Sequence, residues 1–238
     1  MCGRFAVTLP PDAMAQLFQA APSNDLPEVP NFNVCPTNSV HVVRQGETGR
    51  RLLGMRWGLI PSWYKEESGG PLLINARAET VAEKPAFRAA ARERRCLIVA
   101  TGFYEWTKDA EGNRLPWYFR RRDGAPIAFA GLWQAWGRET PRDTCAIVTT
   151  AANDAVSAVH HRMPLVLEPD DWPLWLGEEG KGAARLMQPG APDVLEWYRV
   201  DPAVNSNRAS GPALIEPLEP DAHPAPSPAP DGAQGAAP

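Results

Sequence analysis

The amino-acid sequence predicts an α+β fold in which a predominantly antiparallel, barrel-like β core carries flanking helices in a single domain. Two observations lead to this prediction. Short apolar runs separated by turn residues fill residues 96–149, a pattern typical of antiparallel strands. Two segments that precede this region, residues 12–20 and 85–95, are candidates for short helices. We therefore expect a sheet at the core and helices around it.

The N-terminal helix is expected over Asp12–Ala20. A Pro-Pro pair precedes this segment, which is a common start signal, and Met14, Leu17 and Phe18 recur at a helical spacing. We expect these three side chains to share one apolar face. A second short helix is expected over Pro85–Arg95.

Five strands are expected after the second helix. Turn residues separate them, and two of the turns, Glu-Gly-Asn at 111–113 and Asp-Gly at 123–124, are typical of hairpins. Because a hairpin joins neighbouring antiparallel strands, we expect these strands to form a meander. They are Cys96–Ala100, Tyr104–Thr107, Trp117–Arg121, Ile127–Leu132 and Cys145–Thr149.

The length and composition of the chain predict its domain organisation. A chain of 238 residues fits one large domain, and residues 1–217 contain no long linker. Residues 218–238 are rich in Pro and Ala and show no periodicity, so we expect a disordered tail after the domain.

Charge and hydropathy exclude several classes of protein. A formal net charge of −4 argues against a protein that coats duplex DNA by bulk electrostatics. No apolar run approaches the roughly 20 residues that a membrane helix needs, and no secretory signal is visible. We therefore expect a cytoplasmic protein with no membrane partner. The four cysteines form no C-x-x-C pair, so neither a zinc site nor a redox dithiol is expected, and we expect no cofactor.

Cys2 is the first candidate catalytic residue. An initiator methionine is usually removed before a small residue, so the mature chain is expected to begin with Cys2. The α-amino group titrates at about pH 8 and the thiol at about pH 8.5. Together they form a 1,2-aminothiol, whose amine condenses with an aldehyde and whose thiol then closes a five-membered thiazolidine ring. The pattern predicts an aldehyde trap; the alternative is a terminal cysteine without a chemical role.

Glu105 and His160 are candidates for acid–base chemistry. Aromatic neighbours flank Glu105, and burial among them would disfavour the charged carboxylate. His160 lies in His-His-Arg-Met-Pro, and imidazole titrates near neutral pH. The alternatives are a solvent-facing or Arg-paired carboxylate and a metal-ligating histidine, although no further ligands accompany the histidine pair at suitable spacing.

Other polar and aromatic side chains suggest contact with nucleic acid. On an extended segment, Asn75, Arg77 and Glu79 would share one face. The amide offers a donor and an acceptor, and the guanidinium can clamp a phosphate. Trp63, in an aromatic loop that contains proline, can stack on an unpaired base. The alternatives are a polar turn that satisfies its own backbone and a tryptophan packed in the core.

Seven motifs, in the family's order, together resemble the SOS-response-associated peptidase (SRAP) family. The resemblance runs from residue 2 to about residue 217 and leaves the Pro/Ala tail outside. The motifs are Cys2-Gly3-Arg4-Phe5, Asn33-Val34-Cys35-Pro36-Thr37, Arg56-Trp57-Gly58-Leu59-Ile60-Pro61, Asn75-Ala76-Arg77-Ala78-Glu79-Thr80, Arg95-Cys96-Leu97, Gly102-Phe103-Tyr104-Glu105-Trp106 and His160-His161-Arg162-Met163-Pro164.

The resemblance implies a barrel-like core, binding of single-stranded DNA and covalent attachment to abasic sites through the N-terminal cysteine. It implies that the catalytic residues are Cys2, Asn75, Glu105 and His160, and that the contacts to DNA phosphates are Arg4, Arg77 and Arg162. Position 161 is variable in the family's pattern, which favours the first histidine of the pair. Two positions depart from the family, where Ala and Gln are more common than Cys35 and Asn38.

We therefore expect a monomeric sensor of abasic sites in single-stranded DNA. Mature Cys2 would form a thiazolidine crosslink with the ring-opened deoxyribose and protect the site during the DNA damage response. A weak abasic-site lyase activity is expected as a side reaction, because an imine permits β-elimination of the 3′ phosphate. Two alternatives remain open: a cysteine peptidase, which acts on other proteins or only on its own Met1, and a noncovalent reader of modified DNA.

Overall fold

The computed structural model describes residues 2–137 and 139–218. Its strands are β1 (Phe5–Val7), β2 (Ala20–Pro22), β3 (Asn31–Val34), β4 (Ser39–Gly46), β5 (Gly49–Trp57), β6 (Asn75–Arg77), β7 (Arg95–Ala100), β8 (Gly102–Lys108), β9 (Arg114–Arg121), β10 (Ile127–Trp136), β11 (Arg142–Ala151), β12 (Arg162–Pro164) and β13 (Leu195–Arg199). The α-helices are α1 (Pro11–Phe18), α2 (Arg88–Glu93), α3 (Asp154–Ser157) and α4 (Trp172–Leu176). Four 3-10 turns follow α3: η1 (Pro169–Asp171), η2 (Ala183–Leu186), η3 (Pro202–Asn205) and η4 (Pro212–Ile215).

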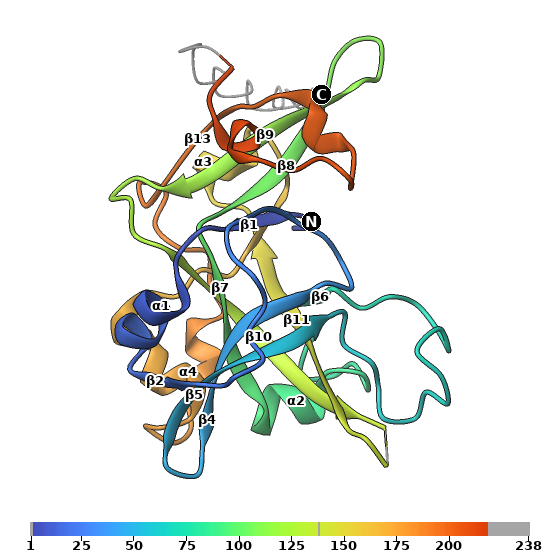
Figure 1. Ribbon diagram of the computed structural model, residues 1–238, viewed down its shortest axis with the longest axis vertical. Coiled ribbons are helices and arrows are strands. Elements are labelled where there is room, and N and C mark those ends of the chain that lie inside the picture. The colour runs from blue at the N-terminus through green and yellow to red at the C-terminus, as the bar shows by residue number, and fades with distance from the viewer. Residues whose placement is uncertain (1, 138, 219–238) are drawn as a thin grey trace, which may run out of the picture.

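The strands form two sheets, stacked one above the other in Figure 1. The upper sheet has the order β13-β9-β8-β1-β3, and the lower has the order β12-β11-β10-β7-β4-β5-β2 with β6 beside β11. Strand β11 also pairs with β5, so β11, β10, β7, β4 and β5 close into a ring. Most pairs are antiparallel. The predicted α+β class with a barrel-like antiparallel core is confirmed.

The predicted meander is wrong at two junctions, because β7 does not pair with β8 and β9 does not pair with β10. The turn at 111–113 joins β8 and β9 in a hairpin, as expected. The Asp-Gly turn at 123–124, however, leads from β9 in the upper sheet to β10 in the ring, where β10 pairs with β7 and β11. A turn signal determines that the chain reverses, but it does not determine which strand the next segment joins.

The helices are shorter than predicted. Helix α1 ends at Phe18 because Gln19 adopts a left-handed conformation with φ of 50°. Met14 and Phe18 are buried, and Phe18 packs against Trp172 of α4 with ring centroids 4.5 Å apart. Leu17 is 40% exposed, so it does not belong to the buried face as expected. Helix α2 has only six residues, and Arg95 already belongs to β7.

Strand β1 lies at the boundary of the two sheets (Figure 1). Its Phe5 packs against Trp57 of β5 and Phe129 of β10, with ring centroids 4.9 and 5.9 Å apart. Because Phe5 is fully buried, the start of the chain is fixed where the upper sheet meets the ring. This placement sets the position of the residues just before β1.

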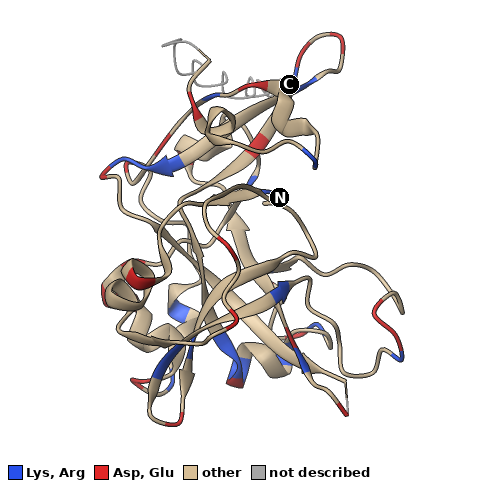
Figure 2. Ribbon diagram, viewed as in Figure 1, with Lys and Arg blue, Asp and Glu red and all other residues tan. Residues whose placement is uncertain are grey.

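Among the described residues, no helix has the length and apolar character needed to span a membrane. Apart from Leu218, the tail expected over residues 218–238 lies outside the described part of the chain. Lysine and arginine residues are spread along the ribbon of both sheets in the view of Figure 2.

Candidate active site

Cys2 precedes β1 and is fully buried. Strand β1 pairs with β8 in the register Phe5↔Phe103, and the Tyr104 amide donates a 2.9 Å hydrogen bond to the Arg4 carbonyl. Because the two strands run in opposite directions, this register carries the residues before β1 alongside the later residues of β8, where Glu105 lies. Pairing of β1 with β8 therefore brings Cys2 and Glu105 together.

The electrostatics of Cys2 and Glu105 reflect this proximity. Burial raises the pKa of the Cys2 thiol, and the negative charge of Glu105 raises it further. Glu105 is 2% exposed, and burial raises the pKa of its carboxyl, an effect that the positive charge of Arg114 opposes. The predicted burial of Glu105 is thus confirmed. A carboxyl with a raised pKa can give and take protons closer to neutral pH.

Asn75 contacts the Cys2 backbone directly. Strand β6 runs parallel to β11, with Asn75 paired to Ile147. From there the Asn75 Nδ2 donates a 2.8 Å hydrogen bond to the Cys2 carbonyl oxygen. The Asn75 Oδ1 is buried and accepts no hydrogen bond from the described residues. Asn75 therefore holds Cys2 with one end of its amide and has an acceptor left over for a ligand.

His160 lies just before β12. Its Nδ1 is 2.9 Å from the backbone nitrogen of Arg162 and 3.1 Å from the backbone oxygen of the same residue. One imidazole tautomer accepts from that N–H, and the other donates to that carbonyl. Burial lowers the pKa of His160, and its ring stacks on that of His161 with centroids 4.4 Å apart. At neutral pH the imidazole is held neutral and able to accept a proton.

The end of β11 brings these elements together. Thr149 pairs with Arg77 of β6 and with Pro164 of β12, so β6 and β12 both lie against the end of β11. This pairing places the strand that carries Asn75 and the strand that follows His160 in one region. The extended segment predicted over Asn75–Glu79 is shorter than expected, because β6 ends at Arg77 and Glu79 lies in the following turn.

The three arginines expected to contact phosphates differ in their surroundings. Arg4 donates to Asn33 Oδ1 at 2.6 Å and to the Val204 carbonyl at 2.9 Å. Arg162 forms a two-fold ion pair with Glu79. Arg77 is exposed, and no described residue forms a salt bridge with it. Of the three, only Arg77 presents a guanidinium that is not already engaged.

The C-terminal part of the domain packs against Arg4, which follows Cys2, and against Asn33 of β3. Besides the contact from Arg4 to Val204, the Asn33 amide donates to the carbonyl oxygens of Ser206 and Ala209, at 3.1 and 2.7 Å. Sequence reasoning missed Asn33, Ser206 and Ala209 as supports for the site. The Asn33 motif was the available signal, but nothing in the spacing indicates a partner more than 170 residues away.

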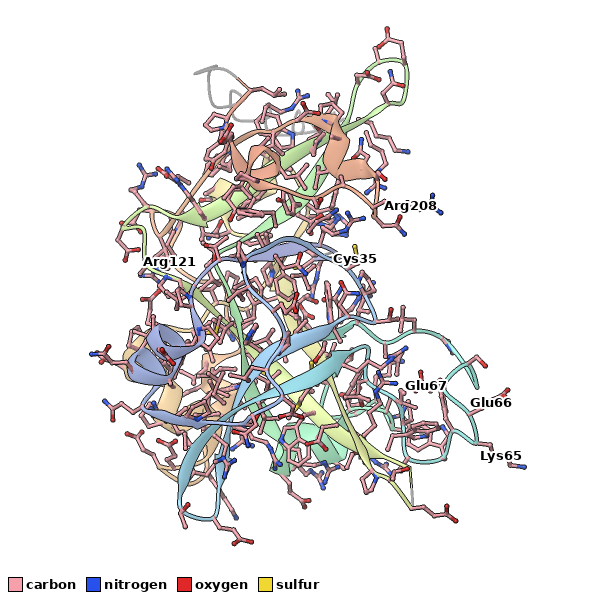
Figure 3. The ribbon with its side chains drawn as sticks, in the orientation of Figure 1. Cys35, Lys65, Glu66, Glu67, Arg121 and Arg208 are labelled. Atoms are coloured by element: carbon pink, nitrogen blue, oxygen red, sulfur yellow. The ribbon has the colours of Figure 1, made fainter. Side chains whose placement is uncertain are left out.

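Cys35 and Trp63 lie on loops. Figure 3 shows Cys35 close to the start of β1, with Arg208 above it and Lys65 on the loop to its lower right. Burial raises the pKa of the Cys35 thiol, while the positive charge of Arg4 lowers it. Trp63 is 57% exposed and meets Tyr64 edge-on, with ring centroids 6.3 Å apart. Trp63 is thus available for stacking, in contrast to buried tryptophans such as Trp57.

Comparison with known proteins gives a consistent family assignment. The family model described as SOS response associated peptidase (SRAP) matches residues 1–207. The abasic site processing protein YoqW of Bacillus subtilis is 36% identical over 224 residues, which cover 91% of this chain and 99% of that protein. The abasic site processing protein YedK of Escherichia coli is 30% identical over 227 residues, which cover 92% of this chain and 100% of that protein.

Solved structures show the same fold. A crystal structure of a protein from Bacteroides thetaiotaomicron superimposes with a TM-score of 0.80 at 23% identity, covering 92% of this chain and all of that one. A protein from Bordetella bronchiseptica superimposes with a TM-score of 0.73 at 26% identity, covering 84% of this chain and all of that one.

Proposed function

This chain belongs to the SOS response associated peptidase (SRAP) family, and we propose that it processes abasic sites by forming a covalent bond between Cys2 and the ring-opened sugar. The observation that carries the proposal is the buried Glu105 carboxyl beside the Cys2 thiol, with Asn75 bound to the Cys2 carbonyl. An acid–base group, a nucleophile and an unused acceptor thus share one site. The names of the curated relatives agree with this substrate.

The proposed reaction needs the α-amino group of Cys2, which cleavage of the preceding peptide bond releases. The open form of an abasic deoxyribose carries an aldehyde at C1′. The Cys2 amine attacks this carbon, the carbonyl oxygen leaves as water, and an imine forms. The Cys2 sulfur then bonds to the same carbon while the thiol proton is transferred to the nitrogen. One water is lost overall, and the product is a thiazolidine.

Each surrounding side chain has a role in these steps. Glu105 carries protons during opening of the sugar and departure of water, as its raised pKa permits. His160 is neutral at pH 7 and exchanges a proton with the sugar hydroxyl or the imine. The buried Asn75 Oδ1 accepts a hydrogen bond from the sugar. A slow ring closure would leave the imine exposed to β-elimination of the 3′ phosphate, and this would give a weak lyase activity as a side reaction.

The protonation state of Cys2 favours attack by the amine before attack by sulfur. Burial and the charge of Glu105 raise the thiol pKa, so little thiolate exists at neutral pH. A cysteine peptidase needs a thiolate with a lowered pKa, supplied by a positive neighbour. Addition of sulfur to an imine makes no such demand, because the thiol proton moves to nitrogen in the same stage. The site therefore suits the aldehyde reaction better than amide hydrolysis.

Single-stranded DNA is the proposed partner. The exposed Arg77 guanidinium would bind a backbone phosphate, and Trp63 would stack on an unpaired base. Arg4 and Arg162 would contribute positive charge near the site while keeping their internal hydrogen bonds.

The test is a denaturing gel with intact mass analysis after mixing the protein with a single-stranded oligonucleotide that carries one abasic site. We expect an adduct that survives denaturation, contains the protein without residue 1, and weighs one water less than the sum of its parts. Cys2→Ser and an undamaged strand should give no such adduct. If wild-type protein beginning with Cys2 yields no adduct yet binds the abasic strand, the noncovalent reader is correct. Cleavage of peptides that depends on Cys2 would instead support the peptidase.

A further inference from the structure

Glu79 and Arg162 form a two-fold ion pair next to the candidate site. Arg162 Nη1 lies 2.6 Å from Glu79 Oε1, and Nη2 lies 2.9 Å from Oε2. The Arg162 side chain is only 11% exposed, whereas that of Glu79 is 50% exposed. Side-by-side pairing of a planar guanidinium with a carboxylate restricts the orientation of both groups.

The ion pair connects two elements across the end of β11. Glu79 lies in the turn after β6, and Arg162 begins β12. Arg162 Nη2 also donates a 2.7 Å hydrogen bond to the Thr149 carbonyl of β11. The same guanidinium thus joins the segment that carries Asn75, the end of β11 and the segment that carries His160.

The backbone of Arg162 in turn orients His160. The His160 Nδ1 lies within hydrogen-bond distance of both the amide and the carbonyl of Arg162. Rotation or displacement of Arg162 would therefore turn the imidazole. Hydrogen bonds of this kind determine ring orientation and tautomer in other histidine sites.

We propose that Glu79 is a positioning residue for His160: by holding the Arg162 guanidinium, it fixes the backbone groups against which the imidazole is oriented. Glu79 itself touches neither the nucleophile nor the reacting sugar in this scheme. The inference rests on the proposed function, since its consequence is the rate of adduct formation.

The test compares Glu79→Gln with wild type in two measurements. The first is the single-turnover rate of adduct formation with an abasic strand. The second is the dissociation constant for a strand whose abasic site has been reduced and so has no aldehyde. We expect the rate to fall about tenfold, because small misplacement of a reacting group is costly, and the dissociation constant to change by less than about twofold. The double variant Arg162→Lys/Glu79→Gln should form the adduct no more slowly than the slower of the two single variants. Each substitution alone already breaks the Glu79–Arg162 ion pair, so their effects should not add.

The pH dependence of the rate separates positioning from a general loss of structure. Among the described residues, His161 and Arg162 are the ionisable neighbours that lower the pKa of His160, after burial. Removing the charge of Glu79 leaves that of Arg162 uncompensated, so the acid limb of the rate profile should move to lower pH.

Glu178→Gln is the matched control. Glu178 also forms a two-fold pair, with Nε and Nη2 of Arg50 at 2.7 and 2.9 Å, outside the candidate site. This variant should lose a similar amount of stability in a thermal melt and keep its rate.

The behaviour of wild-type protein shows whether the positioning role of Glu79 or the proposed function itself has failed. If wild type forms no adduct, the proposed function fails and the positioning role fails with it. If wild type forms the adduct and Glu79→Gln reacts normally, only the positioning role is overturned. The positioning role is also overturned if Glu79→Gln changes the dissociation constant for the reduced strand by as large a factor as it changes the rate of adduct formation. It is overturned as well if the Glu178→Gln control forms the adduct as slowly as Glu79→Gln.

Discussion

The side-chain amide of Asn75 donates a hydrogen bond across 2.8 Å to the backbone carbonyl of Cys2, a residue 73 positions earlier in the chain. This bond joins β6, which belongs with the ring, to the segment that precedes β1 of the other sheet. The geometry of the candidate nucleophile therefore depends on both sheets at once.

Asn75→Ala should slow adduct formation while leaving most DNA affinity intact. The substitution removes the donor to the Cys2 carbonyl and the free Oδ1 acceptor, and a lost buried hydrogen bond costs about 1 to 3 kcal/mol. Rates measured under single-turnover conditions, with affinity for a reduced abasic strand measured in parallel, check this. Equal loss of affinity and rate would assign Asn75 to DNA binding alone.

Glu105→Gln should abolish acid–base function yet stabilise the protein at neutral pH. Burial raises the pKa of Glu105 in the folded state. The stabilising contribution of the protonated Glu105 carboxyl is thus fully present below the unfolded pKa of about 4.3, and it is lost as pH rises through the folded pKa. Urea denaturation at several pH values should show the variant exceeding wild type at pH 7 and converging with it near pH 4. A wild type that is more stable at both pH values would contradict the sign.

His41 should make the fold sensitive to mild acid. It is 2% exposed on β4, its Nε2 has no hydrogen-bond partner among the described residues, and burial lowers its pKa. The stability it provides is present above the unfolded pKa, about 6.5, and declines as pH falls through that value towards the lower folded pKa. His41→Gln should flatten this part of the stability curve relative to wild type. An unchanged slope would show that other groups cause it.

Gly102→Ala should destabilise the junction of β1 and β8. Gly102 pairs with Ala6 of β1 and with Arg120 of β9, and an added methyl group would overlap the ring of Tyr118 and the backbone of Phe119. Overpacking of this kind costs about 1 to 3 kcal/mol. A thermal melt gives the change, with Gly112→Ala on the open hairpin turn as a contrast in which only backbone strain contributes.

Local signals in the sequence predicted much of the fold. Apolar runs marked β7 to β11, and the turn at 111–113 correctly predicted the β8–β9 hairpin. The alternation between sheets was not predictable, because the Asp-Gly turn at 123–124 looks the same whether the next strand pairs with β9 or leaves for the ring. That choice depends on which partners bury Phe129 and its neighbours, and this is a property of the whole core.

The candidate site was predictable by residue type but not by contact. The aromatic neighbours of Glu105 indicated burial, which the structure confirms. The bond from Asn75 to Cys2 and the ion pair of Glu79 with Arg162 join positions 73 and 83 residues apart. Sequence periodicity predicts only which residues nearby in the chain share a face of a helix or strand. It therefore could not predict either of these two contacts. The family resemblance implied that Arg162 contacts a phosphate, and nothing in the sequence indicated its carboxylate partner Glu79.

The contact between Arg4 and the Val204 carbonyl has a consequence for biosynthesis. These residues stand 200 positions apart, and Asn33 likewise binds Ser206 and Ala209. A nascent chain on the ribosome therefore exposes Cys2 long before its supports have been translated. Cys2 acquires its buried surroundings only once nearly the entire domain has emerged, so partial translation products carry this candidate nucleophile without the side chains that surround it in the folded domain.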